Sequence, residues 1–355
     1  MNGPNPDQLR PASRSGRQDG FTIVELMIAM LLGLIVIAGV SSVFLANQRA
    51  YRTNTALGDV QDASRIAFEM MARDIRQAGL TGCNSANGRI VNVLANAPAN
   101  AASTVAPAWW ANWGNAIRGY DDASGDPALA DKSPVANTSS LQLIGAAGAP
   151  LAIKEDVPGT NFQLYADTDA LEKGDVVMVC SPDHTAIVQI TGPTHLKQTV
   201  DYNTGNAVSP GNCSSNLGYP NTACTGNSPE YTFPPNSLIS RMSAVDWYIG
   251  TNPVNGDSLY RATLVHDAAG LHVQAQEMVR NVTNMTITYL APGNPAINSA
   301  YQTATTIGAS SAWGGVGAVR VTLKLRSGED NVSADGSSAL TRTYSFTTAV
   351  RNRLH

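Results

Sequence analysis

An apolar segment near the N-terminus, from Phe21 to Ala46, constrains this chain more than any other feature of its sequence. Its only charged residue is Glu25. At a rise of about 1.5 Å per residue, a helix of this length crosses a hydrocarbon core about 30 Å thick. We therefore predict a transmembrane helix, with membrane lipid as one partner of the chain.

The residues before this helix have the composition of a leader. Residues 1–20 are rich in Pro, Gly, Ser and Asn and carry Arg10, Arg14 and Arg17. Such a segment buries too little apolar surface to fold alone. Basic residues beside a membrane helix stay on the cytoplasmic side, which sends everything after Ala46 across the membrane. The body of the chain is therefore expected to be extracytoplasmic.

Three interpretations of the apolar segment compete. An uncleaved signal anchor is the simplest, and a secretory signal peptide fits less well, because its apolar region is about 7 to 15 residues long. The third gives Glu25 a role, since a carboxylate in the centre of a membrane helix costs about 2.5 to 3.5 kcal/mol and needs a partner or a function. As a helix N-terminal acid, Glu25 would also gain about 0.3 to 1 kcal/mol from the macrodipole.

The rest of the chain has the composition of a folded body. The chain has 355 residues, of which 43% are hydrophobic, enough to form the core of one large or two modest domains. The formal net charge is −4 and the basic residues are scattered, so no nucleic-acid partner is expected. Only 14% of residues are charged, while Gly, Ala, Ser, Thr and Asn are abundant. This balance favours loop-rich β-structure with polar surfaces.

The helical pattern continues past the membrane. Apolar residues at helical spacing share one face, namely Leu57, Val60, Ala67, Met71, Ile75 and Ala78. Gly79 then stands where a left-handed C-cap would end the helix. We predict one helix over residues 21–78, with a membrane half at 21–46, an amphipathic half at 47–78, and a head formed by 79–355.

The head is predicted to be rich in antiparallel β-strands, so the fold class is α+β. Apolar and polar residues alternate from Val319 to Arg326, which is typical of a half-buried strand. Similar patterns at 282–289 and 344–346 suggest its neighbours. Apolar runs at 176–179 and 186–190 flank a turn and predict a hairpin. Long loops are expected at 84–138, 201–235 and 291–315.

Four cysteines, Cys83, Cys180, Cys213 and Cys224, all lie after the apolar segment. If that segment exports the head, disulfides are expected. Cys213 and Cys224 bracket a short loop and form the favoured pair, which leaves Cys83 with Cys180, although two other connectivities stay open. The spacing contains no paired CxxC arrangement and the five histidines are dispersed, so we assign no metal and no cofactor.

Three clusters in the head suggest chemistry but have simpler explanations. The turn 181–184 contains Ser, Asp and His, yet triad members come from separate elements and need an oxyanion hole. Three aspartates between 121 and 126 do not have the spacing of an EF-hand loop, so solvated turn residues are expected. Three tryptophans between 109 and 113 would form an exposed patch or, as we favour, pack against their own domain. No catalytic residue is assigned.

The string Gly20-Phe21-Thr22-Ile23-Val24-Glu25-Leu26 resembles the processing site of type IV pilins and of the pseudopilins of type II secretion. The resemblance implies that a prepilin peptidase cuts after Gly20 and methylates the new N-terminal residue, Phe21. It also implies that Glu25 meets the N-terminal amine of a neighbouring subunit during assembly. Opposite charges attract strongly in a low-dielectric setting, which agrees with that role.

A second stretch narrows the resemblance. ASRIAFEMMARDIRQAGLTGC, residues 63–83, is similar to the same region of the PilW-type minor pilins. Looser similarities follow in the family's order at 174–191, 247–261, 277–289 and the terminal VRNRL. The family implies a pilin-like fold, in which the long N-terminal helix packs on a large antiparallel β-rich head, and a non-enzymatic protein. The stretch 84–140 departs from the family, and its role is left open.

The resemblance implies a minor pilin that helps to prime the type IV pilus in the bacterial inner membrane, with its head in the periplasm or, within a pilus, at the cell surface. Its partners would be the prepilin peptidase, other minor pilins, the major pilin and the inner-membrane assembly machinery. A head as large as 79–355 fits a tip or priming complex better than a tightly packed shaft. Alternatives are a large minor pseudopilin of type II secretion, a membrane-anchored adhesin or binding protein and, more remotely, an anchored enzyme.

Overall fold

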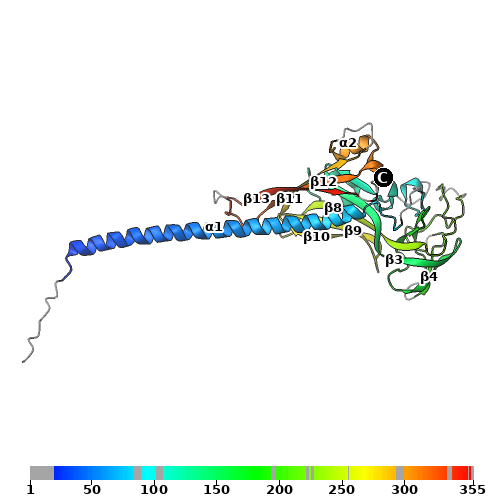
Figure 1. The fold of residues 1–355 in the computed structure, drawn as a ribbon, viewed down its shortest axis with the longest axis horizontal. Helices are drawn as coiled ribbons and strands as arrows, with labels where there is room; N and C mark the ends of the chain where they lie inside the picture. Colours follow the sequence, from blue (N-terminus) through cyan, green and yellow to red (C-terminus); the bar gives the residue numbers. More distant parts are fainter. Residues whose placement is uncertain are drawn as a thin grey trace, which may run out of the picture. The chain divides into compact units, whose positions relative to one another are not determined.

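The computed structural model of the chain describes residues 20–83, 89–100, 107–192, 197–205, 207–220, 224, 228–254, 256–292, 300–333, 338–350 and 352. The chain divides into two compact units, residues 1–54 and 55–355. Helix α1, Ile23–Gln77, begins in the first unit and ends in the second (Figure 1). The long helix predicted for 21–78 is therefore confirmed.

In the first unit, the described residues form the start of α1. Its large apolar side chains between Phe21 and Leu45 are all more than half exposed. Among the described residues, α1 is the one helix that is long and apolar enough to cross a membrane. A surface this apolar suits a lipid environment, because no protein side chain covers it in the described part of the chain.

In the second unit, one face of α1 is buried. Its buried residues are spaced three or four apart except for the neighbours Met71 and Ala72, and they are Ala56, Val60, Ser64, Ala67, Met71, Ala72 and Ile75. The chain leaves the helix at Gly79, whose φ of 74° is in the left-handed region, as the C-cap prediction requires. The Gly79 N–H donates to the carbonyl of Ile144 at 2.8 Å, so the exit turn is bonded to the sheet below it.

Two sheets make up most of the second unit. The larger, ten-stranded sheet has the order β1-β6-β5-β8-β3-β4-β7, with β2 beside β3, and with β9 and β10 continuing from β8. Its strands pair in antiparallel fashion except β1 with β6. They are β1 Ile90–Asn92, β2 Ile117–Tyr120, β3 Ser140–Val157, β4 Asn161–Thr168, β5 Val176–Cys180, β6 Thr185–Gln189, β7 Lys197–Asp201, β8 Leu238–Thr251, β9 Asp257–Asp267 and β10 Gly270–Arg280.

The smaller sheet has three antiparallel strands in the order β11-β12-β13. They are β11 Val282–Leu290, β12 Ala318–Arg326 and β13 Thr341–Ala349. Val321 of β12 lies opposite Ile287 on one side and Phe346 on the other, which confirms the predicted strand and its two predicted neighbours. The predicted β5–β6 hairpin is confirmed as well.

Two of the predicted loops contain regular structure. The segment 84–138 includes β1, β2 and several short 3-10 turns, and the segment 291–315 includes helix α2, Ala304–Ala309. These elements are three to six residues long, too short to show a period in the sequence. They form because distant partners stabilise them: β2, for example, pairs with β3.

The main core lies where α1 meets both sheets. Met71 and Ile75 of α1 share one apolar cluster with Trp247 of β8 and with Val321 and Leu323 of β12. All five side chains are fully buried. In Figure 1 this part of α1 runs beside the strands of both sheets. The second half of the helix is therefore an integral part of the head.

A polar contact anchors the same part of α1. The carboxylate of Asp74 accepts the indole N–H of Trp247 at 2.9 Å, and Arg261 of β9 donates to its two oxygens at 2.8 and 3.3 Å. Only 12% of the Asp74 side chain and 27% of the Arg261 side chain are exposed. Two-pronged arginine–carboxylate pairs are the strongest of the ordinary protein hydrogen bonds. Asp74 therefore joins the helix to β8 and β9.

Replacing Asp74 with alanine should reduce the free energy of unfolding by about 1 to 3 kcal/mol, because it leaves the guanidinium and the indole N–H without their acceptor. Chemical denaturation of the full chain in detergent micelles measures this. Glu69→Ala is the matched control: its pair with Arg65 is 68% and 79% exposed, so the change should stay below about 0.5 kcal/mol. Equal losses in the two variants would contradict the anchoring role.

Candidate functional site

The residues expected to act in processing and assembly lie at the start of α1. Gly20, Phe21 and Thr22 precede the first helical residue, Ile23, and the Phe21 side chain is 88% exposed. Residues 1–19 of the predicted leader lie outside the described residues. The Gly20–Phe21 bond thus belongs to a non-helical, exposed segment, the kind that peptidases cut. Cleavage at this bond stays a prediction.

Glu25 is held by a capping box. Its Oε2 atom accepts the backbone N–H and the hydroxyl of Thr22, both at 3.1 Å, and the Thr22 hydroxyl in turn accepts the N–H of Glu25 at 3.2 Å. This reciprocal pair satisfies donors that a helix start otherwise leaves unbonded. Sequence reasoning missed Thr22, although the spacing Thr-x-x-Glu before an apolar run is the usual signal.

The capping box determines what else Glu25 can bind. Among the described residues, its hydrogen bonds all use Oε2, so Oε1 stays available to a second donor. The side chain is also fixed at the first turn, where the helix dipole favours a negative charge. An ammonium group brought beside this turn would meet an oriented carboxylate.

The structure joins Cys83 to Cys180 and Cys213 to Cys224. This is the pairing favoured from the sequence. The first bond ties the segment after α1 to the end of β5 and closes a separation of 97 residues; the second closes one of 11. In the chain-entropy model, loops of these sizes contribute about 5 and about 3 kcal/mol. The disulfides therefore stabilise the head and fix the exit of the helix.

The side chains of the turn 181–184 do not form a hydrolase triad. The Ser181 hydroxyl donates to Asp183 at 2.9 Å and lies 3.0 Å from the hydroxyl of Tyr231. The His184 ring stacks on Tyr231, and its Nε2 atom lies 2.5 Å from the carbonyl of Leu217. Burial lowers the pKa of His184. Within the described residues, the imidazole makes no hydrogen bond to the Ser181 hydroxyl, so the contacts stabilise a turn.

Asp121 and Asp122 cap neighbouring turns. Asp121 accepts the backbone N–H groups of Ala304 and Thr305, both at 2.9 Å, at the start of α2. Asp122 accepts the N–H of Ser124 at 3.0 Å. Both carboxylates are thus occupied by backbone donors. Among the described residues, no group of three or more His, Cys, Asp or Glu side chains is placed to hold a metal ion.

The expectation of a solvated turn residue is wrong for Asp126, which is only 3% exposed. Its carboxylate accepts hydrogen bonds from Ser140, from Gln142 at 2.6 Å and from the N–H of Ala128 at 2.9 Å. Burial raises the pKa of Asp126, and these hydrogen bonds, led by that of Ser140, oppose the rise. The Asp126 side chain is buried against the sheet because Ser140 and Gln142 of β3 donate hydrogen bonds to it there.

Asp246 of β8 is a second buried carboxyl beside Asp126. It lies opposite Gln142 of β3, is fully buried, and neither of its oxygens has a conventional donor among the described residues. Burial and then the nearby charge of Asp126 raise the pKa of Asp246 well above its usual value. Burial and the neighbouring carboxylate of Asp126 thus both favour the protonated form of Asp246. Sequence reasoning missed it; its only signal was a charge within an apolar strand.

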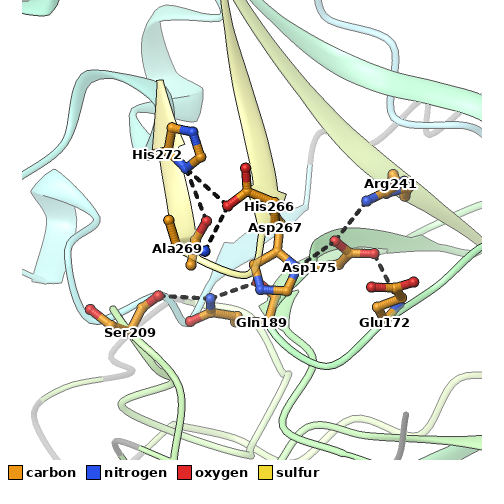
Figure 2. Close-up of polar contacts among 11 residues, drawn as sticks. Glu172, Asp175, Gln189, Ser209, Arg241, His266, Asp267, Ala269 and His272 are labelled. Carbon is orange, nitrogen blue, oxygen red and sulfur yellow. Dashed lines mark hydrogen bonds and ion pairs between the residues drawn. The ribbon is translucent and has the colours of Figure 1, made fainter. Parts of the chain in front are cut away.

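A third polar group, shown in Figure 2, joins the β5–β6 hairpin to β8 and β9. Asp175, whose side chain is 2% exposed, pairs with Arg241 at 2.8 Å and lies 3.4 Å from Nδ1 of His266. Asp175 also accepts the N–H of Glu172 at 2.9 Å. Gly174 leaves room for the imidazole, since a Cβ there would lie 2.2 Å from its Nε2. The group therefore holds the strands together.

Asp246→Asn should change how stability depends on pH. Because the folded-state pKa of Asp246 is raised above its ordinary 3.8, the folded protein keeps a proton that the unfolded protein releases. Stability is therefore highest below that value and falls as the pH rises, by up to about 1.4 kcal/mol per pH unit per proton. The variant should match the wild type near pH 4 and exceed it at pH 7 in chemical denaturation.

A control separates this effect from a general loss of charge. Hydrogen bonds from Ser181 and then Tyr231 lower the pKa of Asp183, so Asp183→Asn should reduce stability at neutral pH, in the opposite direction. Parallel pH profiles for the wild type and Asp246→Asn would contradict the raised pKa of Asp246.

Two protein-family models match the chain, one near its N-terminus and one in its C-terminal part. The model of the prokaryotic N-terminal methylation motif matches residues 15–41, which include the processing string and the start of α1. The model of the type IV pilus-assembly protein W, PilW, matches residues 246–352, from β8 through β13. Comparison with curated proteins and with solved structures finds no match. The two matches together cover less than half of the chain, and both support a minor pilin of the type IV pilus that is similar to PilW.

Proposed function

We propose that this minor pilin helps to prime the type IV pilus and that it has no enzymatic activity. The observation that carries the proposal is the carboxylate of Glu25, which Thr22 orients at the start of an apolar segment, residues 21–46, that is otherwise uncharged and long enough to cross a membrane. A lone membrane anchor would gain only a helix cap from this residue, whose charge costs free energy in lipid. A subunit that must recognise another subunit inside the membrane does gain from it.

The first step would be processing. A prepilin peptidase cuts between Gly20 and Phe21, which leaves an amine at Phe21, one residue before the capping box, and the same enzyme methylates it. Glu25 would then pair with the Phe21 amine of a neighbouring pilin through its available oxygen. In a low-dielectric setting such a pair attracts strongly once both charges are present. The pair would set the register between two membrane helices.

The location follows from the same helix. The first half of α1 anchors the chain in a membrane, and its family matches connect it with other pilins and the pilus machinery. We place the anchor in the bacterial inner membrane and the head in the periplasm, because Arg10, Arg14 and Arg17 precede the helix. Once incorporated into a pilus, the head would reach the cell surface.

The size of the head supports a priming or tip position. A ten-stranded sheet and a second sheet on one helix give each subunit a bulk that repeats poorly in a tight shaft. At a tip, the head has no identical neighbour above it. Contacts to the major pilin would then come from α1 and contacts to other minor pilins from the sides of the head.

Processing is tested by mass spectrometry of the membrane-bound chain, expressed with and without a prepilin peptidase. We expect a mature chain that begins at N-methylated Phe21, only when the peptidase is present. A Gly20→Leu variant should stay uncleaved in both samples, because a bulky side chain replaces the bare glycine beside the cut bond. An intact N-terminus of the wild type in the presence of the peptidase would contradict the processing step.

The assembly role is tested with Glu25→Gln in a strain that lacks the wild-type gene. The variant keeps the size and the capping oxygen of the side chain but loses the charge, so it should be cleaved normally and restore few surface pili. Glu69→Gln, an exposed acid of the same helix, is the control and should restore them fully. Full piliation by Glu25→Gln would contradict the role, and lost protein secretion with intact pili would favour a pseudopilin of type II secretion.

A further inference from the structure

The stretch 84–140, to which neither family match extends, forms a hollow on the large sheet. The hollow has a volume of about 320 Å³ and opens beside β2. The side chains that matter here are Trp109, Asn112, Asn115, Arg118, Tyr120 and Gln142. This volume is within the range of small-molecule sites, which combine apolar walls with a few placed polar groups.

Hydrogen bonds from buried asparagines hold the wall of the hollow in place. Asn92 donates to the carbonyl of Ala111 at 2.7 Å, and Asn100 donates to that of Leu94 at 2.9 Å. Both asparagines are buried. They fix the short turns that present the tryptophan and the two outer asparagines. The hollow is therefore preformed, which lowers the entropic cost of binding.

The floor of the hollow is equally fixed. Gln142 is only 3% exposed, and its amide N–H donates to Asp126 at 2.6 Å. Asp126 is in turn held by hydrogen bonds from the hydroxyl of Ser140 and from the backbone N–H of Ala128. Burying such polar groups costs free energy, which apolar side chains at the same place in the sheet would avoid. The polar floor is therefore not explained by packing alone.

The lining has the chemistry that recognises a sugar with a negative charge. The half-buried Trp109 offers an apolar wall, and the amides of Asn112 and Asn115 can donate to and accept from hydroxyl groups. The guanidinium of Arg118 lies 5.1 Å from the centre of the Tyr120 ring and forms none of the ion pairs found among the described residues. A planar guanidinium pairs best with a carboxylate. We propose that this hollow binds an acidic saccharide.

A second hollow gives room for a longer chain. It has a volume of about 540 Å³, lies between β2 and α2, and shares Arg118 and Tyr120 with the first. Asp121 and Asp122 border it, so the sugar unit on this side is uncharged. The acidic unit belongs at Arg118 and against Trp109. This proposal goes beyond a priming function and does not depend on it.

The test is isothermal titration of the full chain in detergent micelles with three trisaccharides: galacturonic acid trisaccharide, its neutral galactose counterpart, and sialyllactose. We expect at least one acidic trisaccharide to bind about ten-fold more tightly than the neutral one, an increment of about 1.4 kcal/mol. The preferred acid shows whether the ligand has the chemistry of a uronic-acid polysaccharide or of a sialylated glycan. The difference in affinity between the acidic and the neutral trisaccharides should shrink as salt is added.

Matched variants assign the binding to the hollow. Arg118→Gln should reduce the affinity for the acidic trisaccharide about ten-fold, to that of the neutral one. Asn112→Ala should reduce the affinity for both. Arg320→Gln is the control, because Arg320 also stacks on a tyrosine, Tyr301 at 3.8 Å, but borders neither hollow. Binding of no trisaccharide by the wild type, equal affinity for acidic and neutral sugars, or equal effects of Arg118→Gln and Arg320→Gln would overturn the proposal.

Discussion

Burial of one face of α1 between Ala56 and Ile75 is the contact on which the rest of the structure depends. Both sheets contribute to that core, and Asp74 adds charged and polar contacts to β8 and β9. The Cys83–Cys180 bond then fixes the chain where it leaves the helix. The main core of the head is therefore incomplete without the second half of α1, so the element that enters the membrane is also one that the head needs to fold.

The two halves of α1 suit two different environments, a membrane and the protein core. In the first half, large apolar side chains are exposed and the single charge of Glu25 is oriented by Thr22, which suits pairing inside a membrane. In the second half, apolar side chains are buried in protein. Among the polar groups buried in the head, Asp175 joins strands, and Asp126 holds the glutamine at the floor of the hollow. The proposed pairing in the membrane rests on the first of these features, and the proposed saccharide site rests on the hollow in the head.

The features that could be predicted from the sequence are those that depend on residues close together in the chain. The length of α1, the alternation in β12 and the processing string depend on neighbouring residues, so their patterns were visible. Strand β2 and helix α2 could not be predicted, because both are short and depend on distant partners. The burial of Asp126 and of Asp246 has the same cause: a carboxylate in a turn and one in a strand become a pair only when the fold brings them together.

Hydrogen–deuterium exchange of the full chain in detergent micelles tests the central claim, that residues 60–75 of α1 belong to the core of the head. An amide in a cooperative core exchanges only when the whole unit unfolds. The amides of residues 60–75 should therefore exchange as slowly as those of β12. Exchange of this helical segment much faster than that of β12 would show that the head folds without it and would contradict the account.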